Sequence, residues 1–190
     1  MTATAHRPST LPARVRQQED IVTSPLARRV LAVARIVIGS YFVWAFLDKL
    51  FGLGFTTAPE RSVLAGGTPA QGYINNAIAD DQPLKSLYQT LFANPFGDAI
   101  FMLGLLGIGV AMLVGAGVRI AAVSGVLLML FMYLVALPWV GEHGTNPVLD
   151  SHWMEAMLLL IPAVTLAGDT WGAGRWWART SIVQRFPVLR

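Results

Sequence analysis

Long apolar segments alternate with short polar ones along most of this chain. Four of the apolar segments approach the roughly 20 residues that a helix needs to cross a bilayer. They cover residues 26–51, 96–116, 118–138 and 152–168. The pattern predicts a membrane-spanning helix over each of them. Gly115, Ala116 and Gly117 lie where the second span meets the third, so we expect these two helices to form a tight hairpin.

The polar connection over residues 52–95 contains two shorter helical patterns. The turn sequence Gly66-Gly67-Thr68-Pro69 places proline at an early helical position, and an apolar stripe follows over residues 73–78. A second stripe with helical spacing runs over residues 84–92. Both stripes are too short to cross a membrane. They predict two amphipathic helices that lie on the outer membrane surface and cap the spans.

Composition agrees with a membrane protein of one domain. The chain has 190 residues, of which 54% are hydrophobic and only 13% are charged. An average soluble domain carries about twice that charged share. The predicted fold is therefore an all-α membrane protein, a four-transmembrane-helix up-down bundle over residues 26–170, with the two short amphipathic helices in its first outer loop.

The positions of the basic residues predict the topology. Eleven of the 14 Lys and Arg residues fall on one side: six up to Arg35, Arg119 in the hairpin, and four in the C-terminal tail. The positive-inside rule then places both termini in the cytoplasm and the protein in the cell membrane as a multi-pass protein. We expect a disordered cytoplasmic tail over residues 1–25 without a nucleic-acid role, and a cytoplasmic C-terminal tail over residues 171–190.

Two features inside the spans have structural interpretations. Arg35 lies about two turns inside the first span, where we expect its side chain to snorkel to the cytoplasmic surface. Small residues recur every four positions in the hairpin, a pattern that lets helix backbones approach closely in lipid. These residues are Gly107, Ala111 and Gly115, then Gly117, Ala121 and Gly125.

Ionisable residues at the outer ends of three spans are the candidate chemistry of this chain. They are Asp48 and Lys49 of the first span, Asp98 of the second, and His152 and Glu155 of the fourth. Such residues are costly near lipid, so they usually pair with one another or line a polar cavity. His152 and Glu155 share one helix face, and Tyr41 and Trp44 extend the face of Asp48.

Several other interpretations of this cluster stay open. Lys49 could simply pair with Glu155, and Asp98 could favour the N-terminus of its own helix through the helix dipole. His152 and Glu155 have the spacing of metal ligands, and His143 or Asp150 could join them, but no second pair of that kind occurs. We therefore predict no metal site.

Cofactors on the chain itself are largely excluded. There is no cysteine, which excludes iron–sulfur clusters, disulfides and covalent haem. Three histidines, one of them in the N-terminal tail, leave almost no ligands for a haem inside the helices. No Walker or dinucleotide glycine motif occurs. We expect no haem, flavin or iron–sulfur cluster on this chain, so that any redox group is diffusible or belongs to a partner.

The order and spacing of four motifs resemble those of the DoxX/DoxD-like integral membrane proteins over about residues 30–170. The motifs are Arg35…Gly39…Asp48-Lys49, then Leu64-Ala65-Gly66-Gly67-Thr68-Pro69-Ala70-Gln71-Gly72-Tyr73, then Gly109…Gly115-x-Gly117-x-Arg119, and Asn146-Pro147-Val148-Leu149-Asp150-Ser151-His152. The long first loop resembles the DoxD type, the thiosulfate:quinone oxidoreductase subunit. The resemblance implies a four-helix membrane subunit linked to sulfur or thiol redox metabolism and the quinone pool. The DoxD type works with a second subunit, which this chain does not contain.

The function expected from this resemblance is transfer of electrons from a small sulfur anion to a quinone, which acts as a diffusible substrate. His152, Glu155 and Asp48 are the predicted catalytic residues, with His152 and Glu155 exchanging protons. The residues expected to bind quinone or anion are Tyr41, Trp44, Lys49, Arg61 and Asp98. The expected partners are the lipid bilayer and a second protein subunit.

Two further functions compete with this one. The first is a non-catalytic membrane anchor or assembly subunit of a respiratory or redox complex, in which the outer loop or the cytoplasmic tails carry the contacts. The second is a small transporter or channel. The lack of a charged residue deep in a span argues against it.

Overall fold

The computed structural model describes residues 15–76, 78–135, 137, 146 and 148–190. These residues form helices and connecting turns, and no strand occurs among them. The α-helices are α1 (Pro25–Phe51), α2 (Pro69–Asn76), α3 (Lys85–Phe92), α4 (Pro95–Val114), α5 (Val118–Val135), α6 (Ser151–Val164), α7 (Gly174–Trp177) and α8 (Ser181–Arg185). Five single 3-10 turns complete the set: η1 (Gln18–Asp20), η2 (Pro59–Arg61), η3 (Val63–Ala65), η4 (Ala167–Asp169) and η5 (Pro187–Leu189).

Three helices, α1, α4 and α5, are long and apolar enough to cross a membrane. Two of them begin at a capped proline: the Ser24 side chain accepts from the N–H of Ala27, and the Asn94 side chain accepts from the N–H of Gly97. The helix α6 is shorter than the predicted span over residues 152–168. It stops at Val164, and Leu166 then adopts a left-handed backbone conformation (φ 53°).

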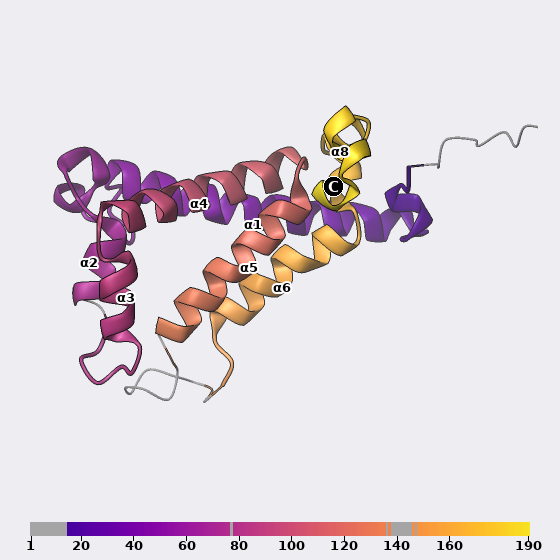
Figure 1. The fold of residues 1–190 in the computed structure, drawn as a ribbon. Coiled ribbons are helices and arrows are strands. Elements are labelled where there is room, and N and C mark those ends of the chain that lie inside the picture. Colours follow the sequence, from indigo (N-terminus) through magenta and orange to yellow (C-terminus); the bar gives the residue numbers. More distant parts are fainter. Residues whose placement is uncertain (1–14, 77, 136, 138–145, 147) are drawn as a thin grey trace, which may run out of the picture.

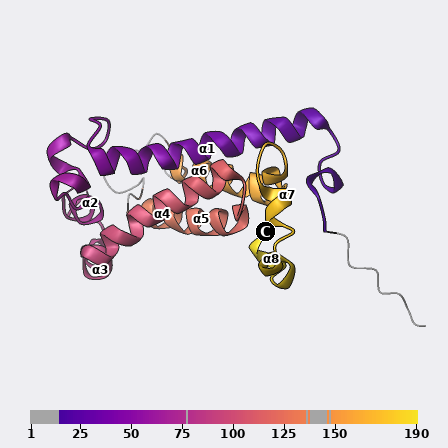
Figure 2. The same ribbon diagram turned by 90° about the horizontal axis from the view of Figure 1, so that it is seen from above.

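The long helices pack as two pairs, α1 with α4 and α5 with α6. Figure 1 shows the pairs diverging from the turn that joins α4 to α5, and Figure 2 shows α1 running along the whole assembly. The α2–α3 segment leaves the opposite end of α4 and reaches the far end of α5. There Tyr88 donates to the Phe131 carbonyl oxygen at 3.0 Å, and Gln82 donates to the carbonyl oxygens of Leu134 and Val135.

Glycines do mediate the closest helix contacts, but most of these glycines lie outside the small-residue pattern predicted over residues 107–125. A Cβ atom at Gly39 of α1 would lie 2.9 Å from the backbone of Leu113, and one at Gly109 of α4 would lie 2.8 Å from the backbone of Val43. Gly125, which belongs to the pattern, packs against Leu159 of α6. Gly107, also in the pattern, meets no atom within 4 Å of an added Cβ, so it makes no such contact.

Arg35 does not snorkel, contrary to the sequence prediction; its side chain is completely buried. All five N–H groups of its guanidinium donate to backbone carbonyls. The acceptors are the oxygens of Met112 and Leu113 (2.9 Å) in the last turn of α4, and of Ala167 (3.3 Å), Thr170 (3.4 Å) and Trp171 (2.9 Å) after α6. The carbonyls at a helix end lack partners within the helix, so the cation completes the end of α4 and joins it to the segment that follows α6.

The residues around η4 also form hydrogen bonds with the N-terminal region, which the structure describes from residue 15. Residues 15–24 belong to the stretch predicted as disordered, yet Gln18 is fully buried. Its backbone N–H donates to Asp169 Oδ2 at 2.9 Å, and the Thr170 hydroxyl donates to Gln18 Oε1 at 2.6 Å. Asp169 also pairs with Arg190 at 2.8 Å. Polar contacts of this kind leave no hydrophobic periodicity for sequence analysis to detect.

Candidate functional site

The start of α6 is fixed by contacts in the preceding segment. The Asn146 side-chain oxygen accepts hydrogen bonds from the N–H groups of Val148 and Leu149, both at 2.9 Å. This is the local turn that asparagine favours. The Tyr133 hydroxyl of α5 donates to the Val148 carbonyl oxygen at 2.7 Å. These contacts determine where residues 150–155 lie relative to the other helices.

Asp150 caps α6 and orients His152. One carboxylate oxygen accepts from the His152 backbone N–H at 3.1 Å, and the other lies 2.6 Å from His152 Nδ1. A carboxylate only accepts hydrogen bonds, so Nδ1 carries the proton in the neutral ring and Nε2 is the basic nitrogen. The sequence pattern indicated Asp150 only as a possible metal ligand. An aspartate at the N-cap position, two residues before a histidine, was the signal for this role.

Glu155 lies one turn further along α6 and contacts α1. Its Oε1 accepts a hydrogen bond from the Tyr41 hydroxyl at 3.1 Å. Glu155 also interacts electrostatically with His152 and Asp150. Tyr41 and Trp44 are both about half exposed on α1. The structure therefore brings three predicted site residues together, Tyr41, His152 and Glu155, and adds Asp150 to them.

The negative charge of Asp150 also acts on a tyrosine of the short helix α2. Burial and the negative charge of Asp150 raise the pKa of the Tyr73 hydroxyl above its ordinary value. At neutral pH Tyr73 is therefore a protonated neighbour of the acidic end of the cluster.

Asp48 is buried and serves the connection that follows α1. Its Oδ1 accepts from the Phe55 N–H at 3.2 Å, and its Oδ2 accepts from the N–H (3.0 Å) and the hydroxyl (2.7 Å) of Thr56. Lys49 does not pair with Glu155 in the structure, since its Nζ donates to Thr56 Oγ1 at 3.4 Å and lies 5.9 Å from the centre of the Phe101 ring. Asp48 thus anchors the turn over residues 52–57, and its buried carboxylate is occupied by Phe55 and Thr56.

Asp98 contacts a different helix from the one we expected. It lies in the first turn of α4, but its carboxylate accepts from the N–H of Ala70 (2.7 Å) and of Gln71 (3.2 Å) and from the Gln71 side chain. It therefore holds the N-terminus of α2. Arg61 is exposed in η2. In the described part of the chain, no hydrogen bond or ion pair joins Asp48, Lys49, Arg61 or Asp98 to His152 or Glu155.

The described residues contain no group of three His, Cys, Asp or Glu side chains that could hold a metal ion. His143, which sequence analysis named as a possible further ligand, lies outside the described residues. Within the described residues, the site consists of two hydrogen-bonded pairs on neighbouring turns of α6: the His152 imidazole with the Asp150 carboxylate, and the Glu155 carboxylate with the Tyr41 phenol. The imidazole and the carboxylate of Glu155 are groups that can accept and release protons.

The chain matches no protein-family model, no curated protein and no solved structure. The resemblance to DoxX/DoxD-like proteins therefore rests on the sequence motifs.

Proposed function

We propose that this protein is the membrane subunit of a thiosulfate:quinone oxidoreductase-like redox system. The observation that carries the proposal is the presence of two hydrogen-bonded pairs, His152–Asp150 and Glu155–Tyr41, on neighbouring turns of α6 on its α1 side. Reduction of a quinone consumes two electrons and two protons. The electrons come from a small sulfur anion, directly or through a partner subunit. The chain itself supplies the groups that deliver the protons.

His152 and Glu155 have distinct roles in the proposed reaction. His152 delivers a proton through Nε2, and Asp150 stabilises the imidazolium that forms when the ring is recharged. Glu155 delivers the second proton, and the Tyr41 hydroxyl holds its carboxylate in place. The quinone ring lies against the exposed faces of Tyr41 and Trp44, where it can enter from the lipid.

The anion is attracted by exposed Arg61 in the connection after α1 and by Lys49 in the last turn of α1. Asp48 and Asp98 act by holding that connection in shape, because their oxygens are already occupied by backbone N–H groups. This part of the proposal replaces the catalytic role that the sequence pattern suggested for Asp48 with a positioning role.

Substitution of His152 tests the activity. Removal of a general acid–base group typically lowers a rate by about 100-fold or more. We expect His152→Ala to lower thiosulfate-dependent quinone reduction in membranes by that factor, and Tyr41→Phe to lower it less. Glu60→Gln, an exposed change in η2, is the matched control and leaves the rate unchanged. Wild-type turnover in His152→Ala would remove His152 from the mechanism.

The proposed topology has four spans, with both termini in the cytoplasm of the cell and α2 and α3 on the outer surface. The 14 residues of α6 extend over only about 21 Å, less than the roughly 30 Å of a hydrocarbon core. The turn over residues 165–169 completes the fourth span. Its irregular backbone is compatible with that position because Arg35 hydrogen-bonds the Ala167 carbonyl.

The absence of native cysteine makes this topology simple to measure. A membrane-impermeant maleimide applied to intact cells should label Asp81→Cys in the α2–α3 connection and should not label Ser181→Cys in α8. After lysis it should label both. Labelling of Ser181→Cys in intact cells would reverse the assignment.

The alternative function is a non-catalytic anchor or assembly subunit. One observation favours it: Asp48 and Asp98, two predicted site residues, already accept hydrogen bonds from backbone N–H groups of the first connection. Gentle purification distinguishes the two functions. A stoichiometric partner protein without bound quinone, together with full activity of the complex in His152→Ala, would support the anchor.

A further inference from the structure

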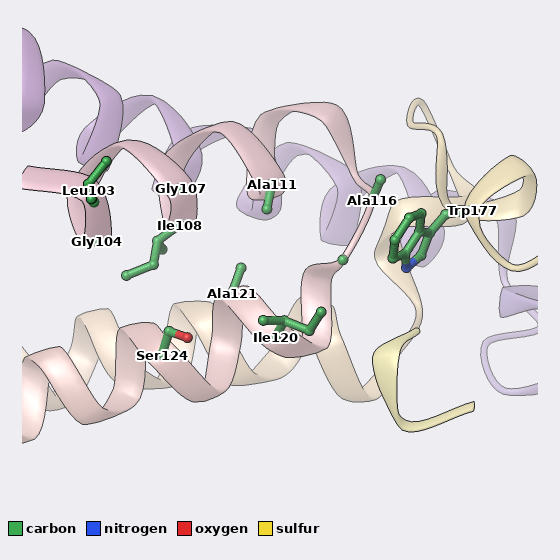
Figure 3. A pocket seen from close by; sticks show the side chains of 11 residues that line it. Leu103, Gly104, Gly107, Ile108, Ala111, Ala116, Ile120, Ala121, Ser124 and Trp177 are labelled. Carbon is green, nitrogen blue, oxygen red and sulfur yellow. The ribbon is translucent and has the colours of Figure 1, made fainter. Parts of the chain in front are cut away.

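A groove opens between α4 and α5 on the side of the hairpin away from α1. Its volume is about 360 Å³. Figure 3 shows Ile108 and Ala111 of α4 facing Ala121 and Ser124 of α5, with Trp177 at the end near the interhelical turn. A second cavity of about 500 Å³ continues along α4 past Leu106 and Val110.

The groove exists because Gly104 and Gly107 have no side chain and no other residue fills the space beside them. A Cβ atom added at Gly104 or at Gly107 would meet nothing within 4 Å. The two helices share the short turn at residues 115–117 and diverge from it, so the space is narrow at that end and wider toward Leu103. Its lining is apolar apart from the Ser124 hydroxyl and the Trp177 indole nitrogen, and the latter donates to the Leu189 carbonyl oxygen.

The narrow end of the groove is strongly basic. Residues 171–190 contain four arginines and no acidic residue, and Arg119 follows directly after the turn. Arg175 pairs with Glu19, and Arg190 pairs with Asp169. Among the described residues, no carboxylate pairs with Arg119 or with exposed Arg179. Arg119 directly precedes Ile120, which lines the groove, and its side chain donates to the Pro187 carbonyl oxygen at 3.4 Å. Arg179 follows Trp177, another lining residue, by two positions. Two arginines without a carboxylate partner among the described residues therefore flank the groove along the chain.

We propose that this groove binds an acyl chain of an anionic phospholipid, whose phosphate group lies against Arg119 and Arg179. Basic clusters at the cytoplasmic ends of membrane helices attract anionic headgroups, and tryptophan prefers this interfacial depth. A second copy of the chain fits less well, because a helix about 10 Å wide cannot enter the narrow end beside Ala116, Gly117 and Trp177. A single acyl chain can. The inference rests on the membrane placement proposed above and is independent of the redox activity.

Lipid titration followed by native mass spectrometry tests the proposal. The full-length protein in detergent is titrated with dioleoyl-phosphatidylglycerol and, separately, with dioleoyl-phosphatidylcholine. We expect tighter binding of the anionic lipid. An arginine near a membrane surface contributes a factor of about five to the binding of an anionic lipid. Arg119→Gln and Arg179→Gln should therefore each weaken the binding of phosphatidylglycerol by about fivefold.

Filling the groove tests the acyl-chain contact separately. Gly107→Leu should abolish the binding of phosphatidylglycerol. Gly104→Leu is a second variant, to be used if the first does not fold. The matched controls are Ala99→Leu, at an exposed position of α4, and Arg29→Gln, at an exposed position of α1. Both should bind the lipid as the wild type does. Thermal unfolding of each variant verifies that it is folded.

Three results would overturn the proposal. The first is unchanged phosphatidylglycerol binding in Gly107→Leu. The second is equal binding of both lipids that the arginine variants do not alter. The third is a dimer in lipid bilayers that Gly107→Leu disrupts without any change in lipid binding, which would assign the groove to a second copy. Because binding is measured without turnover, an inactive protein that still binds phosphatidylglycerol would contradict only the proposed redox function.

Discussion

Replacement of Arg35 by methionine removes the cation that joins α1 to the end of α4 and to the segment that follows α6. Methionine has a similar length and no hydrogen-bond donor, so five backbone carbonyls lose their partner. Three of these carbonyls are only partly buried and can turn to water. Those of Met112 and Ala167 lie in residues that are completely buried and cannot.

The magnitude follows from these two carbonyls. An unsatisfied buried acceptor costs about 1–3 kcal/mol, so the pair costs about 2–6 kcal/mol. Removal of the cation also removes its desolvation cost, which offsets part of this loss. We expect a net loss of about 3 kcal/mol of the free energy of unfolding. For a chain of this size that lowers the midpoint of thermal unfolding by about 6–12 °C.

Thermal unfolding in detergent, followed by circular dichroism, measures the effect. Arg29→Met is the matched control, since Arg29 is exposed near the start of the same helix. Arg35→Lys should fall between the two variants, because an ammonium group keeps the charge but offers three donors instead of five. A midpoint for Arg35→Met within about 2 °C of the control would refute the reasoning, since other groups would then satisfy the carbonyls.

Three further predictions concern contacts around the helix ends. Gly168→Ala should destabilise the protein by about 1–3 kcal/mol in the same assay, because its Cβ would lie 2.3 Å from the Gly115 carbonyl oxygen, whereas Gly72→Ala has open space and should not. Hydrogen bonds from its own backbone and from Arg175 lower the pKa of the Glu19 carboxyl below the ordinary value of 4.5. The ionised carboxylate therefore contributes fully to the free energy of unfolding above pH 4.5, and this contribution disappears as the pH falls through the lowered pKa. Glu19→Gln should therefore be less stable than the wild type at pH 7, and the difference should vanish at strongly acidic pH; a constant difference would contradict this assignment. Asp98→Asn should speed amide hydrogen exchange at Ala70 and Gln71, whereas Asp81→Asn should leave it unchanged, and equal exchange in both variants would show that Asp98 does not hold α2.

Local patterns in the sequence determined the positions of most helices. The apolar runs predicted α1 and α4 to within a residue or two at each start, and glycines 115 and 117 predicted the tight turn between α4 and α5. The apolar run from residue 152 also predicted the start of α6 to within one residue. These features depend on residues within about one helical turn of one another, which the sequence displays directly.

Tertiary structure alone decided what the polar residues contact. Arg35 bonds residues 77 to 136 positions away, and Asp98 bonds a helix 27 residues before it. Their hydropathy and spacing suggested a snorkelling cation and a helix-dipole contact. The groove beside Gly107 has the same origin, because a small-residue stripe permits a close helix contact without determining whether one forms. Pairing of helices is decided by the summed fit of surfaces distant in sequence, and no local pattern contains that information.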